Sequence, residues 1–272
     1  MRAPYIGVTG IVTDADVAAV TACVPLVPPS HRLMTGVLAS AKTLRGERTL
    51  NRRYPLFRDV ERLLAALSAA GAWPVVHFNC RRDDLSDLLP LLAESLPSMR
   101  GLQLNIARPS IFAVGDLCRA RPDVEFILQA NRSAAPSGES VTAEHIGGYV
   151  AEYGRHEAHA LIDLSGGRGE SLNVDLAADL LRRVWRDGWL TRPGVAGGFG
   201  PDAIPALDAL RVALDGSAWP LSSLSFDAES RVRLPCADPI VGEPYQDDLD
   251  PERAFRWVAL ASDAIRAASG AP

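Results

Sequence analysis

A glycine-rich segment just before a predicted helix has the composition of an anion site. The segment AGGFGPDAI (196–204) places Gly197, Gly198 and Gly200 directly after an apolar run, and proline follows where a helix would begin. Glycine lets backbone N–H groups approach a ligand closely, and a helix N-terminus favours negative charge. A tight strand-to-helix turn also needs glycine. The segment therefore predicts either a phosphate site or simply a turn.

Two further groups of residues suggest chemistry on an anionic substrate. Asp163 closes the apolar run HALIDL (159–164), where partial burial can keep a carboxyl group protonated as a general acid. Its alternative role is to orient or cap the glycine-rich loop that follows. The stretch from Lys42 to Arg53 is the most basic part of the chain and suits a carboxylate or phosphate contact, although its first half, to Arg48, can equally be a solvated loop.

Eight apolar runs alternate with segments of helical periodicity and would position these residues. Their continuous apolar character is typical of strands buried on both faces of a parallel sheet. The predicted strands are 5–10, 33–39, 74–79, 101–106, 124–130, 159–164, 194–198 and 224–228. The predicted helices between or after them include 56–71, 84–96, 141–154, 174–185, 201–214 and 251–268. Eight such units without an obvious linker predict an α/β fold, a single-domain (β/α)8 TIM barrel over 1–272, with a doubly wound open sheet as the alternative.

The barrel interpretation places chemistry on the loops after the strands, and two of these loops resemble a known family. AGGFGPDAI resembles the strand-seven signature of phosphoribosylanthranilate isomerase, a tryptophan-pathway barrel whose Gly-Gly backbone binds substrate phosphate. LIDLSGGRGESLNVD (161–175) is similar to that family's strand-six pattern of a strand-end aspartate followed by Gly-Gly-x-Gly. The resemblance implies that Asp163 is the acid of the reaction and that Gly166 and Gly167 belong to the substrate or phosphate site.

The last predicted strand resembles the same family but with changes. SFDAESRVR (225–233) is similar to a segment with an aspartate in the strand and a serine-serine-glycine turn that completes the phosphate cup. Asp227 and Ser230 match this pattern, whereas Glu229 and Arg231 replace serine and glycine. The resemblance therefore implies an altered cup, in which a carboxylate faces the anion and the Arg231 guanidinium offsets it.

Other positions keep or lose family residues. Thr9 stands where the family has the cysteine that removes a proton from the sugar C2, and an alkyl hydroxyl has far too high a pKa to replace a thiolate unaided. Arg53 of NRRYP (51–55) matches the family's substrate-binding arginine, and Gln103 is retained while the following histidine is Asn105. Cys80 ends the third predicted strand and is a candidate replacement base, although a structural thiol explains it as well.

The function predicted from the resemblance is an isomerase-type barrel enzyme acting on a phosphorylated sugar or a related small phosphorylated substrate, with Asp163 and Thr9 at the catalytic positions. Because of the replacements, the tryptophan-pathway step itself is not expected. Two alternatives remain open: a non-catalytic barrel that binds a phosphorylated ligand, and a different lyase that reuses the phosphate cup. Lys42 is the only lysine, which disfavours a Schiff-base aldolase. No cofactor is expected.

Composition excludes several other classes. The net charge of −5 argues against a nucleic-acid partner, and no apolar run approaches the ~20 residues of a membrane helix. The N-terminal stretch is interpreted as a first strand and not as a signal peptide, so a cytoplasmic location is expected. The four cysteines form no CxxC pair, so reduced thiols are expected. No metal site is predicted: His77 is assigned to the core, and the pair His156 and His159 precedes a strand at the end away from the active loops.

A long connection separates the last strand from the last helix. The insertion at about 231–250 has no evident secondary structure, and such connections usually have a role. We expect either a lid over the phosphate end or an oligomer contact, and the sequence leaves open whether the chain forms a homodimer.

Overall fold

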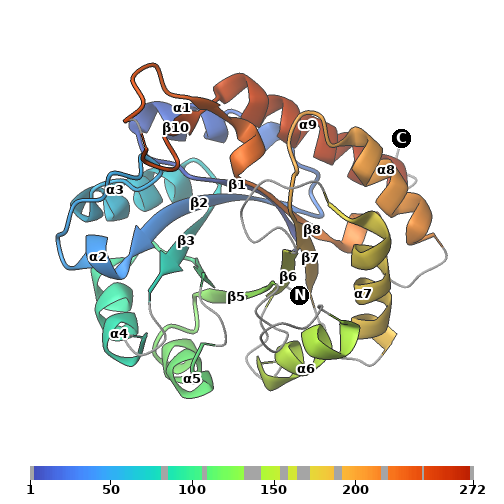
Figure 1. Ribbon diagram of the computed structural model, residues 1–272, viewed down its shortest axis with the longest axis horizontal. Coiled ribbons are helices and arrows are strands. Elements are labelled where there is room, and N and C mark those ends of the chain that lie inside the picture. Colours follow the sequence, from blue (N-terminus) through green and yellow to red (C-terminus); the bar gives the residue numbers. More distant parts are fainter. Residues whose placement is uncertain are drawn as a thin grey trace.

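The computed structural model describes residues 3–80, 85–105, 109–131, 142–153, 159–163, 172–186, 192–215, 220–240 and 242–269. Within these residues, eight parallel strands form a closed barrel in the order β1 to β8. The last strand pairs with the first through Ile6 and Phe226, Gly7 and Asp227, and Val8 and Ala228. Helices surround the strands as an outer ring (Figure 1). The (β/α)8 barrel is therefore confirmed, and closure rules out the open sheet.

The strands and helices follow the predicted alternation. The barrel strands are β1 (Tyr5–Thr9), β2 (Arg32–Ser40), β3 (Trp73–Asn79), β4 (Gly101–Leu104), β5 (Glu125–Ala130), β6 (His159–Asp163), β7 (Pro193–Ala196) and β8 (Ser225–Ala228). The α-helices are α1 (Asp14–Thr21), α2 (Ala41–Leu44), α3 (Phe57–Ala69), α4 (Leu85–Ser95), α5 (Ile111–Ala120), α6 (Ala143–Tyr153), α7 (Val174–Arg186), α8 (Ile204–Ala213) and α9 (Pro251–Ala268). Short 3-10 turns are η1 (Val24–Leu26), η5 (Leu221–Ser223) and η6 (Ser230–Val232).

Strand β7 is shorter than predicted. The sequence extended it through Gly198, but Gly197 and Gly198 have φ angles of 111° and 69°, which a strand does not tolerate. The strand therefore ends at Ala196, and the glycine turn begins at the mouth of the barrel.

Apolar burial holds the two layers together. In α3, Val60, Leu63, Leu64 and Leu67 recur at helical spacing and are buried on the face turned to the strands, whereas Leu56, just before the helix, is exposed. Inside the barrel, Tyr5, Met34, Trp73, Val75, Ile127, Leu161 and Ala196 form a separate apolar cluster. The interior is therefore packed, and chemistry is confined to the strand ends.

The insertion at about 231–250 is not structureless. Arg233–Pro235 (β9) and Asp247–Leu249 (β10) pair as a two-stranded antiparallel sheet. Two three-residue strands are unstable alone, so side-chain contacts must hold them. Arg52 and Arg53 form ion pairs with Asp248 and Asp247, and the Gln246 amide donates to the Leu50 carbonyl. The β10 segment therefore lies against the chain that follows β2, near α1 and α3 (Figure 1).

A polar cluster lies at the start of the strands, at the end of the barrel opposite the loops that follow the strands. Arg32 on β2 makes two hydrogen bonds to Glu125 on β5, at 2.7 and 2.9 Å, and Nε2 of His159 on β6 lies 2.7 Å from Glu125 Oε2. Trp73 packs against the Arg32 guanidinium at 3.8 Å. His159 is thus used structurally, and His156 lies outside the described residues. In the described part of the chain, no cluster of three or more His, Cys, Asp or Glu suits a metal ion.

Two composition-based expectations can be compared with the structure. Cys23, Cys80, Cys118 and Cys236 are all described, and no disulfide links any of them. Among the helices described, none combines the length and apolarity required to cross a membrane.

Candidate functional site

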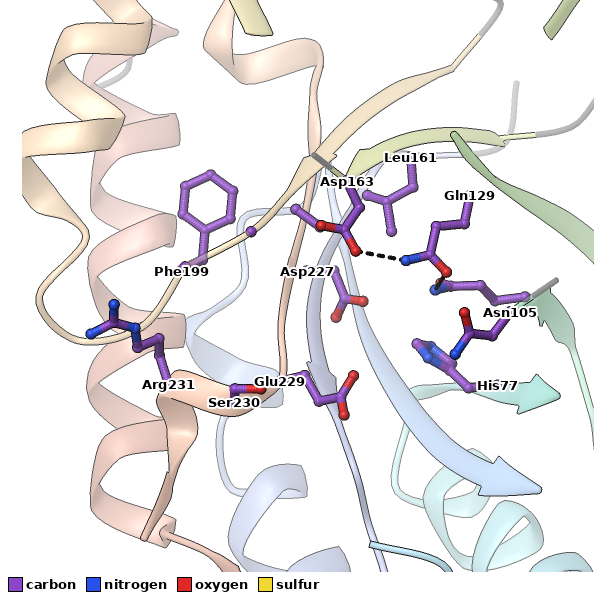
Figure 2. Close-up of a pocket in the computed structure, with 14 residues that line it drawn as sticks. His77, Asn105, Gln129, Leu161, Asp163, Phe199, Asp227, Glu229, Ser230 and Arg231 are labelled. Atoms are coloured by element: carbon purple, nitrogen blue, oxygen red, sulfur yellow. Dashed lines mark hydrogen bonds between the residues drawn. The ribbon is translucent and has the colours of Figure 1, made fainter. Parts of the chain in front are cut away.

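A cavity opens at the carboxyl ends of strands β3 to β8. Figure 2 shows Asp163, Asp227 and Glu229 directed towards its centre, with Gln129, Asn105 and His77 on the opposite wall. This is the end of a barrel where catalytic residues are found, because the loops there are free to vary without disturbing the packed core. The cavity is therefore the candidate active site.

The glycine loop forms one wall of the cavity. Gly197 and Gly198 line it, and their positive φ angles direct the chain sharply away from β7 towards α8. Within the described residues, the amides of Gly197, Gly198 and Gly200 donate to no protein acceptor. A Cβ at Gly200 would lie 2.5 Å from the Arg231 Cβ, so this glycine lets the loop contact the turn after β8. The glycine turn after β7 and the turn after β8 therefore lie side by side, and an anion can bind between them.

The turn after β8 supplies the adjoining wall. Glu229 accepts a hydrogen bond of 2.6 Å from Nη1 of Arg53, and Ser230 Oγ accepts one of 3.3 Å from the same atom. Figure 2 shows the Arg231 guanidinium turned away from the Glu229 carboxylate. Arg53 therefore neutralises Glu229 directly, in place of the expected Arg231, because Arg53 reaches across from the loop after β2.

Asp163 ends β6 and is held by an amide chain. Its Oδ2 accepts a hydrogen bond of 2.7 Å from Gln129 Nε2, and Gln129 Oε1 accepts a weaker one, at 3.5 Å, from Gln103 Nε2. All three side chains are buried and line the cavity. The amide chain therefore fixes the position of the Asp163 carboxyl group at the wall of the cavity.

Asp227 lies in a different environment on β8. Burial, together with the charges of Glu229 and Asp163, raises the pKa of Asp227 well above its ordinary value, while a hydrogen bond from Thr9 acts in the opposite direction. That bond runs from Thr9 Oγ1 to Asp227 Oδ1 at 3.1 Å. Because Oδ1 accepts from Thr9, Oδ2 is the oxygen on which Asp227 can carry its proton. Asp227 is therefore the carboxyl group suited to donate a proton.

Thr9 joins Asp227 to a histidine. Its hydroxyl oxygen lies 3.3 Å from Nε2 of His77. Burial lowers the pKa of His77 to about 3, so the ring is neutral near pH 7 and Nε2–H can donate to the Thr9 oxygen. Thr9 therefore acts here as a connector between two cavity-lining side chains, a role that does not require it to ionise.

Two strand glycines create the space for this connection. A Cβ at Gly36 would lie 2.5 Å from Thr9 Oγ1 and 3.0 Å from His77 Nε2, and a Cβ at Gly7 would lie 2.6 Å from Asp227 Oδ1. Real Cβ atoms essentially never approach so closely, so any larger residue would displace the polar groups. The chain is thus adapted to hold Asp227, Thr9 and His77 in contact.

The Arg53 guanidinium binds carboxylates of the protein itself. Nε and Nη2 bind the two carboxylate oxygens of Asp247 at 2.9 and 2.6 Å, and Nη1 binds Glu229. Its side chain is 5% exposed. A substrate carboxylate at Arg53 would compete with two carboxylates already in place.

The structure brings most of the predicted site residues together. One cavity is lined by Asp163, Asp227, Gln103, Gly197, Gly198, Ser230 and Arg231. Thr9 lies behind Asp227, Gly200 supports the glycine loop, and Arg53 lines an adjoining cavity. Gly166 and Gly167 fall outside the described residues.

Some functional candidates were missed or assigned a lesser role. Gln129 and Asn105 carry no motif, and only their position at strand ends could have indicated them. His77 was assigned to the core, and it is indeed buried, yet it also faces the cavity.

Comparison with known proteins bears on the fold. No family model matches the chain, and no curated protein matches it. Among solved structures, phosphoribosylanthranilate isomerase from Thermus thermophilus aligns with a TM-score of 0.59 and 18% identity over 97% of this chain and 99% of that chain. The fold is phosphoribosylanthranilate isomerase-like. The enzyme from Pyrococcus furiosus gives a TM-score of 0.58 with 14% identity over 96% and 99% of the two chains.

The same architecture is shared with other barrel proteins. Tryptophan synthase from Mycobacterium tuberculosis aligns with a TM-score of 0.53 and 16% identity over 97% of this chain and 93% of that chain. At these identities, the similarity shows a phosphoribosylanthranilate isomerase-like fold. It does not identify a substrate, because one barrel architecture supports many reactions.

Proposed function

We propose that this barrel is an isomerase that moves a proton within a phosphorylated sugar or a related small phosphorylated substrate, in a reaction other than the tryptophan-pathway step. The observation that carries the proposal is that two buried carboxyl groups, Asp163 and Asp227, line one cavity and that the pKa of Asp227 is raised well above its ordinary value. A carboxyl group that keeps its proton, next to a second carboxyl group in the same cavity, provides an acid and a candidate base.

The raised pKa of Asp227 assigns it the acid role and leaves Asp163 as the base. Asp163 removes a proton from the carbon next to a sugar carbonyl, and the C–H electron pair forms a carbon–carbon double bond. The π electrons of the carbonyl move to its oxygen, which takes the proton from Asp227. Asp163 then gives its proton to the former carbonyl carbon. The other hydroxyl of the enediol returns a proton to Asp227 as its oxygen becomes the new carbonyl oxygen. The sequence resemblance assigned the acid to Asp163, whereas the pKa of Asp227 favours the exchanged assignment.

The glycine loop supports a phosphate anchor beside this pair. Amides of Gly197, Gly198 and Gly200 without protein acceptors can donate to phosphate oxygens. The negative charge nearby is reduced, because Asp227 retains its proton to higher pH than usual and Arg53 pairs with Glu229. The cavity therefore accommodates an anion despite its three carboxyl groups.

Replacement of Asp163 by Asn tests the proposal. We expect turnover of pentose and hexose monophosphates, followed by ³¹P NMR, to fall by at least about 100-fold, since the base is removed without a change of shape. Binding of inorganic phosphate, measured by calorimetry, should persist. Unchanged turnover would overturn the assignment of Asp163. Phosphate binding by a wild-type protein that turns over none of these sugars would instead support the non-catalytic barrel.

A further inference from the structure

A second cavity adjoins the candidate active site. His77, Asn105 and Glu229 line both cavities, so a ligand can extend from one into the other. The second cavity lies between the ends of β2 and β3, the turn at 51–54 and Tyr245 before β10. Nothing in the proposed chemistry at Asp163 and Asp227 uses this space.

The charges around the second cavity are already balanced. Arg53, which lines it, pairs with Glu229 and Asp247, and Arg233 pairs with Asp247 as well, at 2.6 Å. Two guanidinium groups thus face two carboxylates. His77, with its lowered pKa, is neutral near pH 7. The residues described around this cavity therefore offer no unmatched positive charge to an anionic ligand.

The remaining polar groups on its wall are uncharged. Asn51, Asn79 and Asn105 each supply an amide, and Tyr54 supplies a hydroxyl that hydrogen-bonds with Asn79. Asn51 Oδ1 accepts from the Arg53 amide, which leaves its NH₂ group as a donor. Amides combine donors with an acceptor, the pattern that neighbouring hydroxyl groups of a polyol require.

An aromatic side chain stands at the rim. Tyr245 is the one described non-glycine residue with a positive φ, 57°, and such strain tends to persist at functional sites. Its ring packs against the Arg53 guanidinium at 4.6 Å and is nonetheless 46% exposed. An exposed ring beside amide groups provides an apolar surface on which the C–H face of a sugar can stack.

We propose that this second cavity binds an uncharged, hydroxyl-rich ring such as a furanose or pyranose, and not a ring bearing a carboxylate. The proposal rests on the proposed function and specifies its substrate: a phosphorylated sugar that carries an uncharged sugar-like group. The phosphate would occupy the glycine loop, the reacting carbons would lie at Asp163 and Asp227, and the second ring would lie between Tyr245 and Asn79.

Saturation-transfer NMR tests this directly. The probes are methyl β-ribofuranoside, methyl α-glucopyranoside and benzoate, each added to the wild-type protein. We expect signals from at least one glycoside and none from benzoate. Tyr245→Gly, which keeps the left-handed backbone and removes the ring, should weaken the glycoside signal at least about five-fold, as should Asn79→Leu. Phe255→Ala is the matched control, because Phe255 on α9 is 45% exposed, and it should have no effect.

The outcomes separate this inference from the proposed function. Inorganic phosphate, measured by calorimetry, reports on the glycine loop alone. Two outcomes would overturn the claim that the second cavity binds an uncharged ring and leave the isomerase proposal standing. One is phosphate binding without glycoside binding, and the other is a benzoate signal that Tyr245→Gly removes. Glycoside binding without phosphate binding would overturn the phosphate anchor and support the cavity assignment. If neither phosphate nor a glycoside binds, both the phosphate anchor and the assignment of the second cavity are overturned.

Discussion

At the scale of single residues, Thr9 carries an unexpected role. A threonine cannot serve as the base that the resemblance placed at this position, because its hydroxyl does not ionise near neutral pH. Instead it donates to Asp227 and contacts His77, and both bonds are fully buried. The hydroxyl thus sets the protonation of the neighbouring acid by lowering its pKa against the effect of burial.

Replacing Thr9 by Val removes this hydrogen bond and keeps the shape. Because the bond lowers the pKa of Asp227, its loss should raise that pKa further. If Asp227 is the acid, the alkaline limb of the pH profile of turnover should move to higher pH, whereas Thr9→Ser should keep the wild-type profile. An alkaline limb that is the same in Thr9→Val and wild type would contradict the role of Asp227 as the acid.

At the scale of elements, the β9–β10 sheet is held by a charge network. Asp247 accepts hydrogen bonds from both Arg53 and Arg233, and Arg233 also donates to the carbonyl of Gly10 at 2.9 Å. Gly10 has a φ of 99°, and a Cβ there would lie 2.3 Å from Arg233 Nη1. The loops after β1, β2 and β8 are therefore joined at one half-buried carboxylate.

Asp247→Asn should destabilise the protein by about 2–3 kcal/mol, because two buried guanidinium groups lose a charge partner. Asp248→Asn is the control, since Asp248 pairs with Arg52 at the surface and such pairs contribute about 0–1 kcal/mol. Urea unfolding gives both values, and limited proteolysis should cut Asp247→Asn within 236–246. Equal stability of the two variants would show that the network does not hold the sheet.

The pH dependence of this network has a definite sign. Burial alone would raise the pKa of Asp247, but the hydrogen bonds and charges of Arg53 and Arg233 outweigh it and lower the pKa below the ordinary 3.8. A lowered pKa contributes stability above the unfolded-state value, and that stability is lost as pH falls through the folded-state value. The β9–β10 sheet should thus remain attached until strongly acidic pH.

At the scale of the whole molecule, the barrel is closed at its other end by a second network. Arg32, Glu125 and His159 connect β2, β5 and β6. Burial would raise the pKa of Glu125, yet hydrogen bonds from His159 and Arg32 and the Arg32 charge lower it to about 2. Burial also lowers the pKa of His159, so this ring is a neutral donor and Arg32 supplies the charge that keeps Glu125 ionised.

Glu125→Gln therefore tests a stability contribution that depends on pH. The shift from 4.5 to about 2 corresponds to about 3 kcal/mol at neutral pH, lost as pH falls from about 4.5 towards 2. In urea unfolding, wild type should be more stable than Glu125→Gln at pH 7, and the difference should close near pH 2. A difference that stays constant over this range would mean that the Glu125 charge does not contribute.

The sequence predicts the fold of this protein better than the contacts of its site. Continuous apolar runs predicted all eight strands, because buried parallel strands leave that pattern regardless of their neighbours. The contacts that define the site join residues far apart in the chain, such as Thr9 with Asp227 and Arg53 with Asp247. No local pattern records such contacts. The sequence therefore did not predict the contacts of Arg53 with Asp247 and Glu229, and the short β9 and β10 were missed.

Solvent deuterium exchange tests the central claim, proton transfer at a carbon by Asp163 and Asp227. Pentose and hexose monophosphates would be incubated in D₂O with the wild-type protein, and the C–H signal next to the carbonyl would be followed by ¹H NMR. The account predicts loss of that signal with at least one sugar phosphate, slowed at least about 100-fold in both Asp163→Asn and Asp227→Asn. Exchange that proceeds equally in wild type and both variants would contradict it.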